Sequence, residues 1–188
     1  MRRIYQVISI LAFTTTAAMS SNYGGVFIGG GLGLGMLRNQ TTYTDTALGD
    51  GKTTDSKIGA AYQLHAGYLH EVGASKTLIG GDIYVSGSSA KKSGSIGVNN
   101  QPIVGTLEQK RSTGFGIALI AGKLVNPKVM IYGRMGYEVS RYDVKLTLTG
   151  QTPQTSTHSF TGAVPGMGLN YKATPNILVG LGYDYAGL

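Results

Sequence analysis

Apolar side chains alternate with small or polar ones along several stretches of the chain. From Ile58 to Tyr68 every second residue is apolar or aromatic, and the residues between them are small or polar. This two-residue period predicts a β-strand with one apolar face. The same reading gives six further strands, at Val26–Met36, Ile79–Val85, Phe115–Ala121, Val129–Val139, 157–172 and Ile177–Tyr185.

The second face of these strands is rich in glycine, which makes up 30 of the 188 residues, and only 13% of the residues are charged. A soluble sheet would instead carry charged residues on its second face. A wall that is apolar outside and small or polar inside is typical of a transmembrane β-barrel, because only a closed barrel satisfies every backbone amide of strands in lipid. The pattern therefore predicts an all-β, antiparallel, up-and-down barrel.

The first twenty residues have the pattern of a secretory signal peptide. Arg2 and Arg3 precede the short apolar run Ile4–Phe13, and small residues follow up to Ser20. Such a run is too short for a spanning helix. We expect residues 1–20 to be a signal peptide cleaved near Ser20 and residues 21–188 to form one barrel domain.

The chain is basic, with a net charge of +7, but its cations are scattered through predicted loops. This distribution indicates solvated loops that also meet anionic lipid head groups, and it does not favour a nucleic-acid partner. The absence of cysteine excludes disulfides and thiol chemistry and is compatible with export.

The segments between the strands alternate between long and short. The long ones are Arg38–Lys57, Gly87–Leu107 and the stretch from Val139 to Thr157, and the short ones are Val72–Lys76, Leu124–Lys128 and Ala173–Asn176. Outer-membrane barrels have long external loops and short periplasmic turns. The alternation therefore predicts that the mature N-terminus is periplasmic.

The alternation changes phase within the fifth strand. Its lipid-facing residues up to Val139 have odd numbers, whereas Val144, Leu146 and Leu148 have even numbers. A shift of one residue exchanges the two faces of a strand. We expect a β-bulge near Arg141–Asp143 and an extramembrane hairpin beyond it.

Two segments resemble the OmpA-like family of small outer-membrane β-barrels. Tyr23–Gly31 is similar to the family's first strand, and Gly166–Asn176 with Ile177–Tyr185 is similar to its strand, Thr-Pro-Asn turn and strand near the C-terminus. The resemblance implies a bacterial outer-membrane location. It implies contact with membrane lipid and lipopolysaccharide, insertion by the barrel-insertion machinery, and a possible host-surface ligand at the outer loops.

Seven antiparallel strands cannot close into a barrel, because the first and the last would run parallel. Small barrels of this family have eight strands, and their last strand normally ends in an aromatic residue, whereas this chain stops at Ala186-Gly187-Leu188. We therefore expect an eight-stranded type with about seven strands present and a C-terminal strand missing.

Several polar residues fall on the inward faces of the predicted strands. They are Gln63, His65, Asp82, Tyr84, Tyr132, Arg134 and Glu138. His65, Asp82 and Arg134 fall at a similar height, and the strand between the last two presents only small residues inward. Unpaired charges inside a narrow barrel cost several kcal/mol each, so a charge-paired plug is the favoured interpretation. A gated proton or ion path through the same residues is the alternative.

No pattern in the sequence points to catalysis, a cofactor or a metal. His158-Ser159 lies near the outer rim but has no acidic partner in register, and the glycine string Gly29–Gly33 lacks the helix of a nucleotide-binding motif. The three histidines share no metal-ligand spacing. We predict a non-enzymatic protein with a structural or adhesion-like surface role carried by its loops. The alternatives are a narrow pore and, less favoured, an enzyme that modifies lipid A.

Overall fold

The computed structural model describes residues 3–18, 23–45, 49–73, 76–96, 105–148 and 151–187. These residues contain nine strands. They are β1 (Arg3–Ala18), β2 (Gly25–Asp45), β3 (Gly49–Val72), β4 (Thr77–Ser88), β5 (Lys91–Ile96), β6 (Gly105–Asn126), β7 (Val129–Leu148), β8 (Gln154–Thr174) and β9 (Ile177–Gly187). No helix in the described part of the chain has the length and apolar character needed to cross a membrane.

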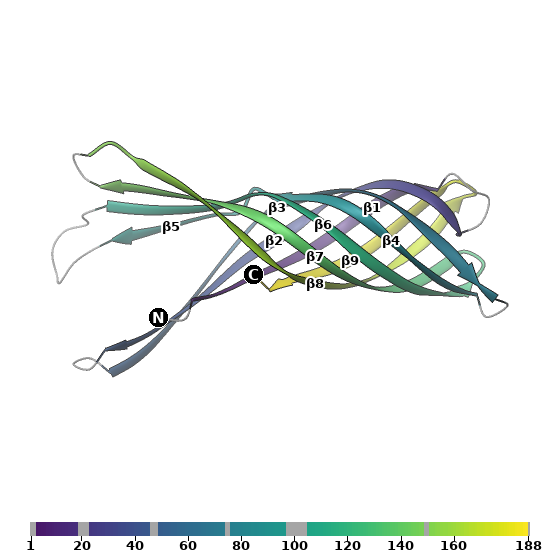
Figure 1. The fold of residues 1–188 in the computed structure, drawn as a ribbon, viewed down its shortest axis with the longest axis horizontal. Coiled ribbons are helices and arrows are strands. Elements are labelled where there is room, and N and C mark those ends of the chain that lie inside the picture. The colour runs from purple at the N-terminus through teal and green to yellow at the C-terminus, as the bar shows by residue number, and fades with distance from the viewer. Residues whose placement is uncertain are drawn as a thin grey trace.

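Eight of these strands form a closed ring in the order β1-β2-β3-β4-β6-β7-β8-β9, and every neighbouring pair is antiparallel (Figure 1). β5 lies outside this ring and extends along β6 beyond the end of β4. The ring confirms the predicted antiparallel up-and-down barrel. All seven predicted strands are present, as β2, β3, β4, β6, β7, β8 and β9.

The eighth place in the ring, between β2 and β9, is taken by β1. This strand comes from the segment with the signal-peptide pattern, and it pairs with β2 on one side and with β9 on the other. An even number of antiparallel strands lets both edges of the sheet meet, which seven strands cannot do. Cleavage near Ser20 and a further strand beyond Leu188 stay predictions.

Most strands are far longer than a membrane requires. β3 has 24 residues and β6 has 22, whereas about 9–11 residues span a bilayer. The prediction of a loop at Arg38–Lys57 is therefore wrong, because β2 and β3 stay paired through this segment up to Asp45 and Gly49. Two groups of strands, β5–β8 and β1–β3, extend beyond the barrel at one end, here called the long-strand end (Figure 1).

The prediction of a bulge near Arg141–Asp143 is also wrong, because the bulge lies in the neighbouring strand. β7 pairs with β8 without any shift, and the irregularity lies in β6, between Arg111 and Gly114. β7 therefore keeps one phase, and Val144 and Leu146 lie on the same face as the buried Tyr142. The extra residue in β6 turns Arg111 into the lumen, where it is buried.

The outer wall carries the predicted apolar face. Large apolar side chains on it are strongly exposed, for example Leu64 at 63% and Leu119 at 73%, and their inward neighbours Gln63 and Ala118 are buried. Apolar residues with this exposure suit a wall that faces lipid. The other end of the barrel, here called the short-turn end, has short connections after β3, β6 and β8, and Gly73, which follows β3, has a φ of 61° that favours glycine.

Candidate functional site

Arg134 of β7 lies at the centre of a buried polar cluster in the middle of the lumen. Its Nη2 donates to Asp82 Oδ1 on β4 at 3.1 Å, and its Nη1 donates to Asp184 Oδ2 on β9 at 3.0 Å. The guanidinium carbon lies 4.1 Å from the ring centroid of Tyr84, which is a cation–π distance. One guanidinium thus joins strands from three parts of the ring.

Gln63 and His65 of β3 complete this cluster. The Gln63 amide lies 3.1 and 3.2 Å from the two Nη atoms of Arg134, and its oxygen accepts from both when it faces the guanidinium. His65 Nδ1 lies 3.9 Å from Asp82 Oδ2, and its ring meets Phe27 edge to face. The Arg134 layer is defined by its members, which are Gln63, His65, Asp82, Tyr84, Arg134 and Asp184.

A second polar cluster lies toward the long-strand end. Arg111 Nη2 pairs with Glu138 Oε1 and also donates to Ser86 Oγ at 2.8 Å, while Ser86 Oγ donates to Glu138 Oε2 at 3.0 Å. Ser140 donates to the same carboxylate and accepts from Arg111 Nε at 3.3 Å. These four residues are the Arg111 layer, and all of them are buried.

The two layers differ in formal charge. The Arg134 layer holds one guanidinium and two carboxylates, whereas the Arg111 layer holds one of each. Buried charges are tolerated when they are paired and hydrogen-bonded, and both layers pair their arginine with carboxylates, although Arg134 Nε has no hydrogen-bond partner within the described part of the chain.

Glycines make room for these long side chains. A Cβ on Gly114 would lie 2.3 Å from Glu138 Oε1, one on Gly116 would lie 2.3 Å from Tyr84 Cζ, and one on Gly166 would lie 1.9 Å from Asp184 Oδ1. Each of these distances is a clash with a buried polar group or with the tyrosine ring. The glycine-rich inward faces of β6 and β8 are therefore a packing requirement of the two layers.

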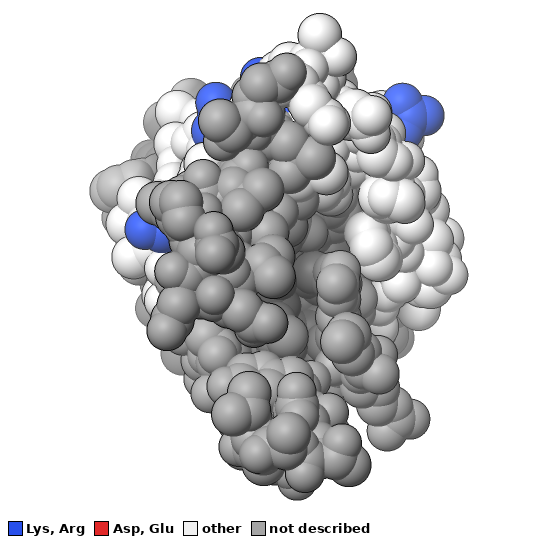
Figure 2. Space-filling view, turned by 90° about the vertical axis from the view of Figure 1, so that its left-hand side faces the viewer, with Lys and Arg blue, Asp and Glu red and all other residues white. Residues whose placement is uncertain are grey.

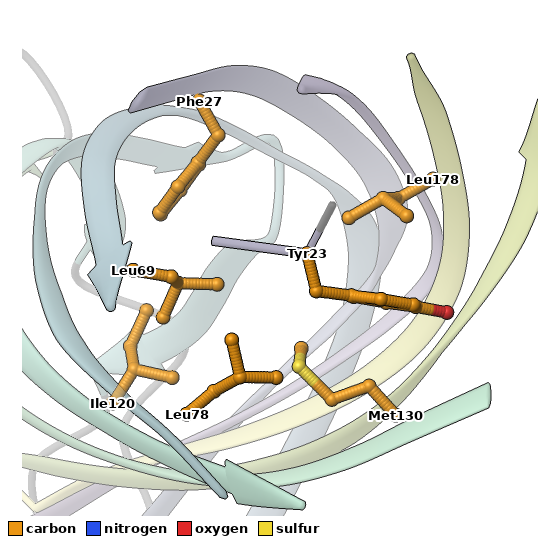
Figure 3. Packing of buried hydrophobic residues seen from close by; sticks show 7 residues of the cluster. All are labelled: Tyr23, Phe27, Leu69, Leu78, Ile120, Met130 and Leu178. Atoms are coloured by element: carbon orange, nitrogen blue, oxygen red, sulfur yellow. The ribbon is translucent and has the colours of Figure 1, made fainter. Parts of the chain in front are cut away.

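Apolar side chains fill the lumen below and above the polar layers. The cluster at the short-turn end is drawn in Figure 3 and consists of Tyr23, Phe27, Leu69, Leu78, Ile120, Met130 and Leu178. Its members point toward one another from several strands around the ring (Figure 3). Tyr132 packs against this cluster, and a smaller one around Tyr142 and Phe160 lies above the Arg111 layer. The lumen was expected to be small and polar, so these apolar layers were missed.

The spaces left inside are small. One cavity of about 50 Å³ lies between the apolar cluster and the Arg134 layer, and another of about 20 Å³ lies between the two polar layers. Cavities of this size hold a few water molecules at most. An eight-stranded barrel has an interior that side chains can fill, and here they fill it in stacked layers.

The structure brings together most of the predicted lumen residues but divides them. Gln63, His65, Asp82, Tyr84 and Arg134 share the first layer, Glu138 belongs to the second, and Tyr132 lies with the apolar cluster. Sequence reasoning missed Asp184, Arg111, Ser86 and Ser140. Strand alternation alone places Asp184 inward, because it stands between Tyr183 and Tyr185 on the lipid-facing phase. Arg111 had no such signal, because the bulge in β6 inverts its facing.

The His158-Ser159 pair does not come together. Neighbouring residues of a strand point to opposite faces, and His158 Nε2 instead lies 3.2 Å from Ser156 Oγ. Within the described residues no three His, Cys, Asp or Glu side chains are placed to hold a metal ion. The charged groups of the lumen are joined to one another across the ring by ion pairs and hydrogen bonds, which suits the closing of a passage better than the binding of a substrate.

Comparison with known proteins places the chain among membrane barrels. A family model described as the outer membrane protein β-barrel domain matches residues 7–188. Among curated protein sequences no significant match was found.

Several solved structures are similar to the chain. Ail, the attachment invasion locus protein of Yersinia pestis, is 16% identical with a TM-score of 0.36, over 97% of this chain and 96% of that one. The same protein in complex with the heparin analogue sucrose octasulfate is 14% identical with a TM-score of 0.34, over 98% and 97% of the two chains. A major outer membrane protein from Thermus thermophilus is 14% identical with a TM-score of 0.33, over 100% and 99%.

Proposed function

Because the chain belongs to the outer membrane protein β-barrel family, we propose that it is a non-enzymatic surface protein of the bacterial outer membrane whose binding part lies outside the membrane. The binding part is the outer sheet, formed by β5 and by residues 105–110 of β6, 141–148 of β7 and 154–160 of β8. Its ligand is expected on the surface of a host. The membrane lipid, lipopolysaccharide and the barrel-insertion machinery are the other partners that this role requires.

The observation that carries this proposal is the length of the strands beyond the lipid-facing band. β7 continues for nine residues past Val139, the last member of its apolar row, and β8 pairs with it as far as Leu146. A protein that only had to span the membrane would not need a four-stranded sheet in water. The ordered backbone of such a sheet offers a stable surface for recognition.

The outer sheet presents hydroxyl and basic groups. Thr155, Thr157 and Ser159 of β8 are exposed on one face, in register with Lys145, Asp143 and Arg141 of β7. Thr157 Oγ1 donates to Asp143 Oδ1 at 2.8 Å, which ties the two rows together. Basic side chains are also visible around the described part of this end in Figure 2. Such a face suits a ligand with acceptor or anionic groups.

One edge of the outer sheet is open. β8 pairs with β9 only from Gly166 onward, so residues 154–165 have a strand partner on the β7 side alone within the described part of the chain. Unpaired edges can bind an extended segment of another protein by adding a strand. The proposed ligand can therefore engage both the face and the edge of the outer sheet.

The plugged lumen argues against the pore as the main role. Two buried ion-pair layers and two apolar clusters stand in series along it, and each would have to open for a hydrated ion to pass. A lipid A mass spectrum with and without the protein tests the enzyme alternative. An unchanged spectrum is the expected result.

The test of the binding role is a shortened hairpin. Asp143 and Thr157 face each other, so residues 144–156 can be replaced by Asn-Gly, the two-residue turn that suits such a hairpin. The matched control is Pro127→Gly, which changes a turn to Asn-Gly at the other end. Cells that carry the shortened protein should lose attachment to host cells, and control cells should keep it. Equal attachment by both would refute a binding role for the outer sheet.

A further inference from the structure

The lipid-facing wall has a groove near the short-turn end. The register aligns Ile79 of β4, Ala121 of β6, Gly133 of β7 and Met167 of β8 in one outward row. Ala121 and Gly133 are small, whereas their lipid-facing neighbours along each strand are not. A Cβ added to Gly133 would meet nothing within 4 Å. The wall is therefore notched at this point.

The notch is large and almost wholly apolar. Its volume is about 940 Å³, and its sides are formed by large apolar residues, among them Ile79, Ile131, Met167, Leu169 and Leu181. Its length follows the strands toward the short turns, where Lys123 and Thr77 border it. An apolar notch that ends at a cation is complementary in shape and charge to a lipid with an anionic head group.

The cation at the end of the notch belongs to a basic arc. Lys76, Lys123 and Lys128 are exposed, and Lys172 lies 5.5 Å above the ring of Tyr23. Backbone hydrogen bonds hold the turns together, from Leu124 N to Lys76 O at 3.0 Å and from Lys172 N to Lys128 O at 2.8 Å. Four lysines thus follow one another around the part of the rim that adjoins the notch.

We propose that this notch is a binding site for an anionic glycerophospholipid. One acyl chain lies over Ala121 and Gly133, and the phosphate meets the ammonium of Lys123, with the neighbouring lysines of the arc adding to the attraction. Each lysine near an anionic head group raises affinity roughly fivefold. The site is separate from the outer sheet, and it would fix the depth of the barrel at its short-turn end.

A second groove provides an internal control. It has a similar volume, about 850 Å³, and is lined by Ala66, Gly81, Leu119, Met135 and Ala163 among others, but no lysine borders it. If any lipid simply coats the wall, the two grooves should behave alike. If the basic arc selects an anionic lipid, only the notch at Ala121 and Gly133 should prefer that lipid, and the second groove should show no preference.

The experiment is native mass spectrometry of the full chain, folded in detergent and given equal amounts of phosphatidylglycerol and phosphatidylcholine of the same acyl chains. The wild type should retain one phosphatidylglycerol at least about fivefold more often than phosphatidylcholine. Lys123→Gln should remove most of this preference, while Lys57→Gln at the long-strand end should keep it. Gly133→Leu should reduce retention of both lipids, and Ala163→Leu in the second groove should not.

Ala121→Leu fills the same notch without changing a glycine, and it replaces Gly133→Leu if that variant does not fold. Equal retention of the two lipids by the wild type would overturn the proposal, as would full retention in Lys123→Gln. A dimer that excludes lipid and is lost on filling the notch would assign the site to a second copy of the chain instead.

Discussion

The Arg134 and Arg111 layers hold the same kind of group in different surroundings. Arg134 meets two carboxylates from different strands together with an amide and an aromatic ring, whereas Arg111 meets one carboxylate and two serine hydroxyls. The first layer depends on its arginine to hold two like charges together. The second would keep hydrogen bonds to its carboxylate even without its arginine. The consequences of removing each arginine should therefore differ.

Arg134→Ala should give the largest loss of stability. It leaves Asp82 and Asp184 buried without their shared cation, and breaking a buried pair from one side costs about 3–5 kcal/mol. We expect a value at the upper end of that range in a denaturant titration of the protein folded into lipid vesicles. A loss below that of Arg111→Ala would contradict the assigned roles.

Arg111→Ala should cost about 3 kcal/mol, because Glu138 loses its cation but keeps the hydroxyls of Ser86 and Ser140. The same titration measures it. Glu138→Gln on the Arg111→Ala background should recover part of the loss, because the remaining amide carries no charge. Additive losses in these two variants would mean that the pair is not coupled.

Leu64→Arg tests the wall beside the layers. Leu64 is exposed near the middle of the lipid-facing band, so an arginine there should destabilise the barrel by about 2–4 kcal/mol in lipid vesicles. Gln63→Arg, one residue away, should instead depend on the Arg134 layer, and its loss should shrink when Arg134 is replaced by alanine. If both single variants lose the same stability on both backgrounds, the facing of β3 is misassigned.

Asp184→Asn should have the smallest effect, about 1–2 kcal/mol. The amide oxygen can still accept from Arg134, Asp82 remains as its charged partner, and the Asp184 side chain is partly exposed. The measurement is again the titration in vesicles. A loss equal to that of Arg134→Ala would show that the second carboxylate, and not the first, holds the layer.

The two layers also differ in how far the sequence could predict them. Asp82 and Arg134 lie on regular strands, so the two-residue period places both inward and at one height. Arg111 lies beside the bulge in β6, and nothing in the sequence of β6 marks that bulge. In β7 the apolar residues move from the outward face to the inward face beyond Val139, and this change of face was misread as a bulge in β7.

The outer hairpins were hidden for a related reason. The sequence beyond Arg38 is mostly polar and has no two-residue period, so it gives no signal for a strand. The apolar cluster at the short-turn end was missed because Phe27, Leu69 and Leu78 stand at inward positions that a lipid-facing criterion ignores. Residues 3–18 have the composition of a leader, which gave no reason to expect a strand. They pair as β1 because the other seven strands leave a gap between β2 and β9, and this gap is a property of the whole ring.

The central claim is that both layers close the lumen, which leaves binding to the outer surface. Conductance across a planar bilayer tests it most directly, with the wild type compared with single and double alanine variants of Arg134 and Arg111. The wild type should conduct little, each single variant should open occasionally, and the double variant should open most often. Steady conduction by the wild type, unchanged in all three variants, would contradict the claim and favour the pore.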